Sequence, residues 1–146
     1  MLNWTKYLDN TSLIIPNASL YHFGVLTSNV HMAWVRAVCG RIKSDYRYSK
    51  DIVYNNFPWP DADGEQSAQI SALARCVLDS RAVFPGAVLS DLYDPVSMPK
   101  ELLKAHQNLD LAVLRLYGFT KLDTPESTIV AALFERYQML VRNEAI

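Results

Sequence analysis

The stretch Leu20-Tyr-His-Phe-Gly-Val-Leu-Thr-Ser-Asn-Val-His-Met-Ala-Trp-Val-Arg-Ala-Val-Cys-Gly40 decides the fold of the N-terminal part, because helical spacing runs through it with one interruption. Leu20, Phe23 and Leu26 share one helix face. The polar triplet that follows contains Ser28, whose short side chain suits the N-cap of a second helix. That second helix is indicated by apolar residues at helical spacing before Gly40: Val30, Ala33, Trp34, Ala37 and Val38. We therefore predict a helix pair with a tight break.

Two short β-like runs flank this helix pair. Ser12-Leu-Ile-Ile-Pro16 and Ile52-Val-Tyr-Asn-Asn-Phe57 are rich in β-branched and aromatic residues, and proline closes each of them. They predict a small α/β unit in which short strands flank the helices. A polar segment between the second helix and the second strand would form an exposed, hairpin-like rim.

Beyond Pro60 the pattern is helical almost throughout. Asp61-Ala-Asp-Gly64 is a linker, and apolar stripes then follow over residues 65–81, from Pro99 to a C′ residue at Gly118, and from a Thr124 cap onward. The prediction is a mainly α chain with a small α/β N-terminal part and a small helical bundle. We place the boundary between residues 1–62 and 63–146.

Composition narrows the protein class. The chain has 146 residues, half of them hydrophobic and a fifth charged, which suits a folded domain with a real core. No apolar run approaches the roughly 18 residues of a membrane span, and the N-terminus lacks a signal-peptide layout. We expect a cytoplasmic protein without a membrane partner. Cys39 and Cys76 lie in apolar helical contexts, which favours buried free thiols.

Charge is distributed unevenly along the chain. Residues 1–60 carry six Lys and Arg against three acids, whereas the remainder carries eight against twelve. The cations concentrate in the window Arg41-Ile-Lys-Ser-Asp-Tyr-Arg-Tyr-Ser-Lys-Asp51, where they alternate with tyrosines. Cations attract a phosphate backbone and tyrosines can stack on bases, so the window suits a nucleic-acid surface. A solvated turn between two elements is the alternative for a short charge run.

Catalytic motifs are absent from the sequence. It contains no glycine-rich dinucleotide or phosphate-binding loop, no His-Glu-x-x-His and no Gly-x-Ser-x-Gly. His22, His31 and His106 are separated by helical geometry or distance, and His106 falls on a core stripe, where we expect a hydrogen-bonded structural histidine. The sequence therefore gives no catalytic residues and no metal site.

Several runs together resemble a known family. They are Leu20-Tyr-His-Phe-Gly-Val-Leu-Thr-Ser28, His31-Met-Ala-Trp-Val-Arg-Ala-Val-Cys-Gly-Arg41, Ser44-Asp-Tyr-Arg-Tyr-Ser49, Val53-Tyr-Asn-Asn-Phe-Pro-Trp-Pro60, Leu92-Tyr-Asp-Pro-Val-Ser-Met-Pro-Lys-Glu-Leu-Leu-Lys-Ala-His106 and Ala132-Leu-Phe-Glu-Arg-Tyr137. They are similar to the C-terminal region of MmeI-like restriction-modification enzymes, from about residue 12 onward. The resemblance implies the end of a DNA target recognition domain followed by a helical C-terminal domain.

The resemblance also implies where activity resides. The family combines an endonuclease with an adenine-specific DNA methyltransferase that uses S-adenosylmethionine. Its Asn-Pro-Pro-Tyr motif, cofactor loop and nuclease cluster are absent from this sequence. We therefore expect a non-catalytic fragment without a cofactor, with S-adenosylmethionine and a divalent metal bound only by the missing domains of a parent enzyme. Expected partners are those domains and double-stranded DNA, bound weakly by the fragment alone.

The basic window then acquires candidate roles. In an extended hairpin arm, Lys43, Asp45, Arg47 and Ser49 would share one side and read bases, since Arg can bond guanine and Asp can accept from cytosine. The family places sequence reading in this region, which favours Asp45 and Arg47. Residues expected to hold phosphates or stack are Arg41, Lys50, Tyr46 and Tyr48. The alternatives are a surface Asp–Arg ion pair and, for the whole chain, a helical protein–protein interaction module with no DNA contact.

Overall fold

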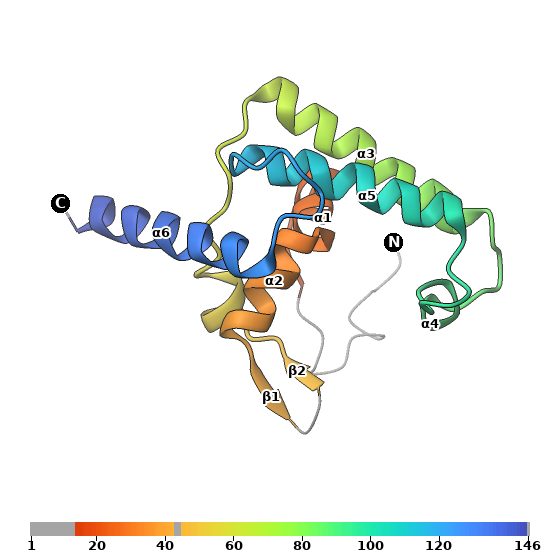
Figure 1. The fold of residues 1–146 in the computed structure, drawn as a ribbon, viewed down its shortest axis with the longest axis horizontal. Helices are drawn as coiled ribbons and strands as arrows, with labels where there is room; N and C mark the ends of the chain where they lie inside the picture. Colours follow the sequence, from red (N-terminus) through yellow and green to blue (C-terminus); the bar gives the residue numbers. More distant parts are fainter. Residues whose placement is uncertain (1–13, 43–44, 146) are drawn as a thin grey trace.

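The computed structural model describes residues 14–42 and 45–145, and for residues 40–42 and 45–47 it describes the backbone alone. The elements follow in the order α1 (Leu20–Thr27), α2 (Asn29–Val38), β1 (Gly40–Ile42), β2 (Asp45–Arg47), η2 (Lys50–Tyr54), α3 (Gly64–Ala82), α4 (Leu89–Leu92), α5 (Lys100–Leu116) and α6 (Glu126–Glu144). The chain is mainly helical (Figure 1), which confirms the predicted class.

The helix pair α1 and α2 forms as predicted around one serine. The buried Ser28 Oγ accepts a hydrogen bond from the His31 amide at 3.4 Å and donates one to the Val25 carbonyl at 2.6 Å. One hydroxyl therefore satisfies a donor at the start of α2 and an acceptor at the end of α1. This double use explains how the two helices meet without a connecting loop.

The predicted strands on either side of the helix pair are wrong. Residues 52–54 belong to η2, one turn of π-helix in which the Asn55 amide donates to the Lys50 carbonyl at 2.8 Å. Val53 is buried while Ile52 is 57% exposed, and the Val53 carbonyl accepts from the Trp34 indole at 2.9 Å. Tertiary packing on α2 thus overrides the β-like composition. Residues 14–16 form no strand, and residues 12 and 13 lie outside the described part of the chain.

Helices α3 and α5 lie side by side, and α1 packs against both (Figure 1). The approach of α1 is close at Gly24. A Cβ atom built there would lie 2.8 Å from Ile70 Cγ2 on α3 and 3.3 Å from Leu109 Cδ1 on α5. The missing side chain at residue 24 therefore sets the spacing between α1 and this helix pair.

Helix α6 departs from the predicted bundle because it packs mainly against α2 rather than beside α3 and α5. Ile129 and Leu133 are buried on it, and its C-terminal part projects from the body (Figure 1). The predicted Thr124 cap is also wrong. The Thr124 hydroxyl donates to the Lys121 carbonyl at 2.6 Å, and Pro125 occupies the N-cap position. The C′ position of Gly118 after α5 is confirmed by its φ of 87°.

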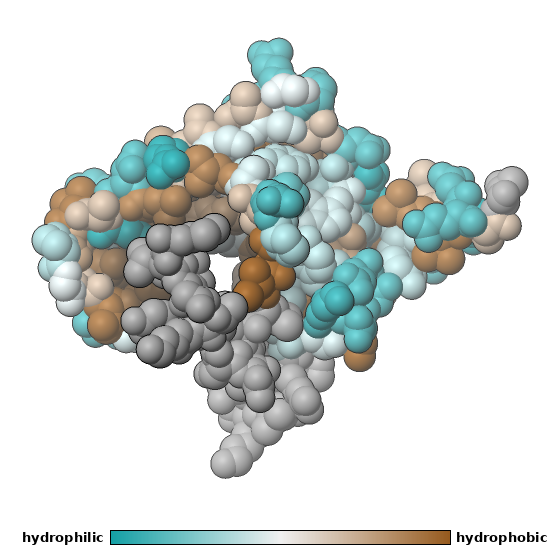
Figure 2. Space-filling model, turned by 180° about the vertical axis from the view of Figure 1, so that it is seen from behind, coloured by the Kyte–Doolittle hydropathy of each residue, from teal (hydrophilic) through white to brown (hydrophobic). Residues whose placement is uncertain are grey.

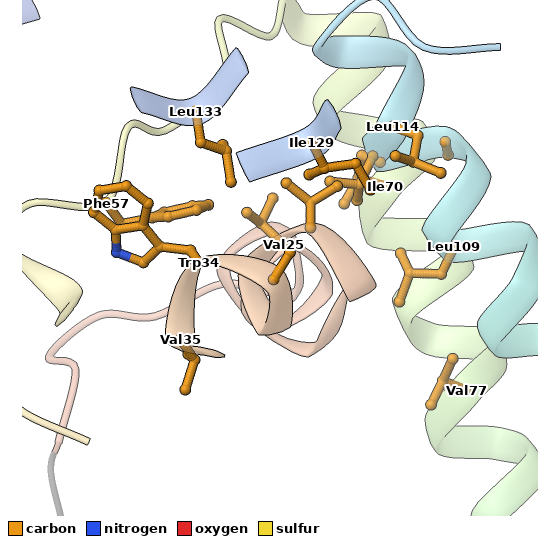
Figure 3. Packing of buried hydrophobic residues seen from close by; sticks show 14 of the residues in the cluster. Val25, Trp34, Val35, Phe57, Ile70, Val77, Leu109, Leu114, Ile129 and Leu133 are labelled. Atoms are coloured by element: carbon orange, nitrogen blue, oxygen red, sulfur yellow. The ribbon is translucent and has the colours of Figure 1, made fainter. Parts of the chain in front are cut away.

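One continuous hydrophobic core joins the segments before and after residue 62. Figure 3 shows Trp34, Phe57 and Leu133 together at one end, with Ile70, Leu109 and Val77 along α3 and α5. Polar contacts reinforce the join, since the Tyr117 hydroxyl donates to the Pro58 carbonyl at 2.9 Å. Cys39 is half-buried and Cys76 is exposed, so the prediction that both thiols are buried is wrong.

Candidate nucleic-acid interface

A β-hairpin arm projects from the C-terminal end of α2 (Figure 1). Strands β1 and β2 pair antiparallel, with Gly40 opposite Arg47, Arg41 opposite Tyr46 and Ile42 opposite Asp45. We call residues 40–47 the arm. Its β1 strand begins two residues after α2 ends, so the direction of the helix fixes where the arm leaves the body.

The arm contains five of the eight residues predicted to contact DNA. Arg41 lies in β1, and Asp45, Tyr46 and Arg47 follow one another in β2. The register brings the backbones of Arg41 and Tyr46 together across the strand pair. Lys43, the fifth, lies outside the described residues. Of the eight, the three whose side chains the structure describes follow the arm: Tyr48, Ser49 and Lys50.

Tyr48 is tied to the body by a hydrogen bond. Its hydroxyl lies 3.0 Å from Nε2 of His31, although its side chain remains 37% exposed. His31 is 97% buried and meets Phe57 edge to face, with ring centroids 4.5 Å apart. Burial lowers the pKa of His31 to about 4, so the imidazole is neutral near pH 7. Sequence reasoning treated His31 as an isolated histidine and missed this contact, which joins residues 17 positions apart.

Ser49 and Lys50 begin η2. The Ser49 hydroxyl accepts from the Ile52 amide at 3.3 Å and so caps the π-helical turn. Lys50 is exposed. Lys50 therefore follows the arm as an exposed residue, whereas the Ser49 hydroxyl already has a local partner. Contact of either residue with DNA stays a prediction.

An apolar cavity of about 590 Å³ lies behind Tyr48. Its lining comes from four parts of the chain: residues 14–16, Leu26 on α1, one face of α2 (His31, Met32 and Val35), and Tyr48, Lys50 and Tyr54 after the arm. Lys50 supplies the charged group among its described lining residues. Among the lining residues that the structure describes there is no acid or thiol.

Several ionisable groups outside the arm have structural partners. Nε2 of His106 lies 2.5 Å from the Tyr93 hydroxyl, which also accepts from Arg81 at 2.8 Å, so the predicted hydrogen-bonded histidine is confirmed. Burial and the Arg81 charge lower the pKa of His106. Arg36, just before the arm, pairs with Glu126 at 2.9 Å. Within residues 14–42 and 45–145, no three His, Cys, Asp or Glu side chains gather into a metal-binding group.

The helices give no sign of membrane insertion. None of those in the described part of the chain combines the length and apolar character that crossing a bilayer requires. Exposed apolar side chains do occur on the projecting end of α6, where Met139, Leu140 and Val141 are 39–57% exposed. Figure 2 shows this end of the molecule with brown and teal surface intermixed.

Comparisons with known proteins agree over nearly the whole chain. The family described as "MmeI, target recognition domain" matches residues 1–61, and "MmeI, C-terminal domain" matches residues 62–144. DNA methyltransferase A of Bacillus subtilis (strain 168) is 39% identical over 131 residues, which is 90% of this chain and 15% of that protein. A solved structure of the type IIL restriction-modification enzyme MmeI in complex with DNA is 47% identical, with a TM-score of 0.82. That match covers 88% of this chain and 17% of the solved chain.

Proposed function

The chain belongs to the MmeI family, and on that premise we propose that its arm reads DNA sequence as part of a longer restriction-modification methyltransferase. The observation that carries the proposal is the antiparallel pair that projects from the end of α2, because a two-stranded ribbon fits the DNA major groove. The similarity to MmeI, which was solved with DNA, supports the same role.

We assign base reading to positions 45 and 47 of β2. Positions 45 and 47 are two apart on one strand, so their side chains belong to the same face. A guanidinium can bond the two major-groove acceptors of guanine, and a carboxylate can accept from the amino group of cytosine. We assign Arg47 and Asp45 together to one base pair, with Lys43 and Ser49 as further candidates for base reading.

Backbone contacts fall to the flanking cations and tyrosines. Arg41 and Lys50 hold phosphates, which fixes the register of the arm on the duplex without reading sequence. Tyr46 and Tyr48 stack or pack against the sugar edge. The exposure of Lys50 and the partial exposure of Tyr48 are consistent with these roles.

The second part of the chain acts as scaffold. We divide the whole chain into residues 1–62, the end of a target recognition domain, and residues 63–146, a helical C-terminal domain. The change of family match between residues 61 and 62 supports this division. The chain spans about 15% of its curated relative. Adenine methylation with S-adenosylmethionine, and cleavage with a divalent metal, are assigned to other domains of the longer enzyme.

Fluorescence anisotropy with duplex DNA at low and moderate salt tests the proposal. Wild type is compared with Arg47→Ala, with Lys50→Ala, and with Arg75→Ala as the control. Arg75 is exposed on α3, a helix that lies on the far side of the molecule from strands β1 and β2 in Figure 1. Binding should weaken in both arm-region variants and persist in Arg75→Ala, and Lys50→Ala should reduce the slope of log K against log salt by about 1. Equal losses in all three variants would contradict contact by the arm.

The projecting end of α6 supports a second function, capture of a protein partner by the helical part. The exposed Met139, Leu140 and Val141 would then be covered by that partner. Absence of DNA binding at low salt, together with self-association or partner binding that is lost in Met139→Asp, would favour this function over DNA reading.

A further inference from the structure

The arm is attached to α2 at two places. Strand β1 leaves the C-terminal end of the helix, where the Cys39 amide donates to the Val35 carbonyl at 2.8 Å. Strand β2 ends at Arg47, and the next residue, Tyr48, bonds back to His31 near the N-terminal end of the same helix. Residues 31 and 38 lie roughly 10 Å apart along the helix axis. An arm fixed at one point can pivot, whereas an arm fixed at two points of a rigid helix holds its angle.

Histidine at position 31 lowers stability relative to an apolar ring, so its contact with Tyr48 is the feature that explains its presence. Nδ1 of His31 is buried and has no hydrogen-bond partner among the residues that the structure describes, and the ring packs against Phe57. A phenylalanine would fill the same space and leave no polar atom unsatisfied. The atom that distinguishes histidine here is Nε2, and its partner is the Tyr48 hydroxyl.

The segment after Tyr48 is held to α2 as well. The Ser49 cap starts η2, and the Trp34 indole bonds to the Val53 carbonyl at 2.9 Å. His31 and Trp34 are three residues apart, so they lie on neighbouring positions of one helix face. The returning chain is therefore seated along a single face of α2.

We infer that His31 and Tyr48 are positioning residues that fix the angle of the DNA-reading arm on α2. The inference rests on the proposed function of the arm, but the hydrogen bond itself acts without DNA. The Tyr48 hydroxyl then helps to set the angle of the arm, in addition to any contact that the Tyr48 ring makes with DNA.

Hydrogen exchange of backbone amides in the full 146-residue chain tests the inference by NMR. The amides of residues 40–42 and 45–47 are followed in wild type, His31→Phe, Tyr48→Phe and the double variant. The control is Tyr54→Phe, because Tyr54 lines the same cavity and no hydrogen bond joins its hydroxyl to a described residue. Urea unfolding of each variant measures global stability separately.

We expect exchange in the arm to become roughly 2- to 10-fold faster in His31→Phe and Tyr48→Phe, as expected for the loss of one hydrogen bond. The double variant should lose no more protection than either single one, because both remove the same contact. His31→Phe should retain or gain global stability, since it removes an unsatisfied nitrogen. Tyr54→Phe should leave the arm unchanged. DNA affinity should fall in the variants whose arm amides lose protection from hydrogen exchange.

Two results would overturn the inference. One is unchanged arm exchange in His31→Phe. The other is a uniform loss of protection throughout the chain together with reduced stability, which would make the contact an ordinary core interaction. Faster exchange in the arm, with DNA binding that responds to neither His31→Phe nor Arg47→Ala, would instead count against the proposed function of the arm.

Discussion

Replacing Asp110 by asparagine should make the free energy of unfolding rise with pH between about 4 and 6. Asp110 is a largely buried carboxyl group on α5 whose Oδ1 accepts from the Asn29 amide at the start of α2, at 2.9 Å. Burial raises its pKa from 3.8 to about 6, against the lowering effect of that hydrogen bond. A carboxyl group with a raised pKa stabilises the fold most below pH 3.8, and that stability is lost as the pH rises to 6.

His31 has the opposite effect over nearly the same range. Its pKa falls from 6.5 to about 4 in the folded chain, so its contribution is complete above pH 6.5 and is lost as the pH falls to 4. At about 1.4 kcal/mol for each pKa unit, each group changes the free energy of unfolding by about 3 kcal/mol across its window. The two contributions therefore nearly cancel in wild type.

Urea unfolding at pH 4, 5, 6 and 7 gives the free energy of unfolding of each variant minus that of wild type. Titrating groups that both proteins share contribute equally to the two values and cancel in this difference. Asp110→Asn retains an acceptor for the Asn29 amide, and His31→Phe retains an aromatic ring at position 31 but not the titrating nitrogens. From pH 4 to pH 6, the free energy of unfolding of Asp110→Asn measured relative to wild type should rise by about 2 kcal/mol, and that of His31→Phe should fall by about as much. Differences that do not vary with pH would refute the assignment of either group as buried and titrating.

Two further predictions concern packing and specificity. Gly24→Ala should lower the free energy of unfolding by about 1 to 2 kcal/mol, because overpacking against Ile70 outweighs the gain in helix propensity, and chemical denaturation measures it. The matched control Gly64→Ala, which meets no atom within 4 Å, should be neutral or stabilising, and equal losses in both would show that contact at Gly24 is not limiting. In the longer enzyme, exchanging Asp45 and Arg47 for another residue pair should change the methylated site at one base-pair position, as read by sequencing of methylated DNA. Loss of methylation at every site, with no new site, would contradict direct reading by this pair.

Local signals were sufficient to predict most of the helices. Ser28 caps α2, and Gly118 follows α5 with positive φ, because serine and glycine act through their own backbone neighbourhood. Residues 52–57 misled the prediction because Val53 and Phe57 are buried beside Trp34 without an extended backbone. The packing of α6 on α2 was likewise missed, since an amphipathic stripe does not identify its partner.

The candidate site divides in the same way. Interleaved cations and aromatics in residues 41–51 indicated an exposed hairpin, and β1 and β2 pair within that window. The His31–Tyr48 contact and the burial of Asp110 had no such signal, because each depends on residues far apart in the chain. The roles of the arm residues toward DNA stay predictions from the resemblance and from side-chain chemistry.

The continuous core has a consequence for recombination between relatives. A chimaera joined at residue 61 would place α1 from one parent against α3 and α5 from another, so that the contact between Gly24 and Ile70 would have to match by chance. It would also separate Arg136 from its own partners, the Trp59 carbonyl and Asp61. An exchange confined to residues 41–47 would cross none of these contacts. New specificities should therefore arise more readily by point changes in the hairpin than by shuffling whole segments at the apparent boundary.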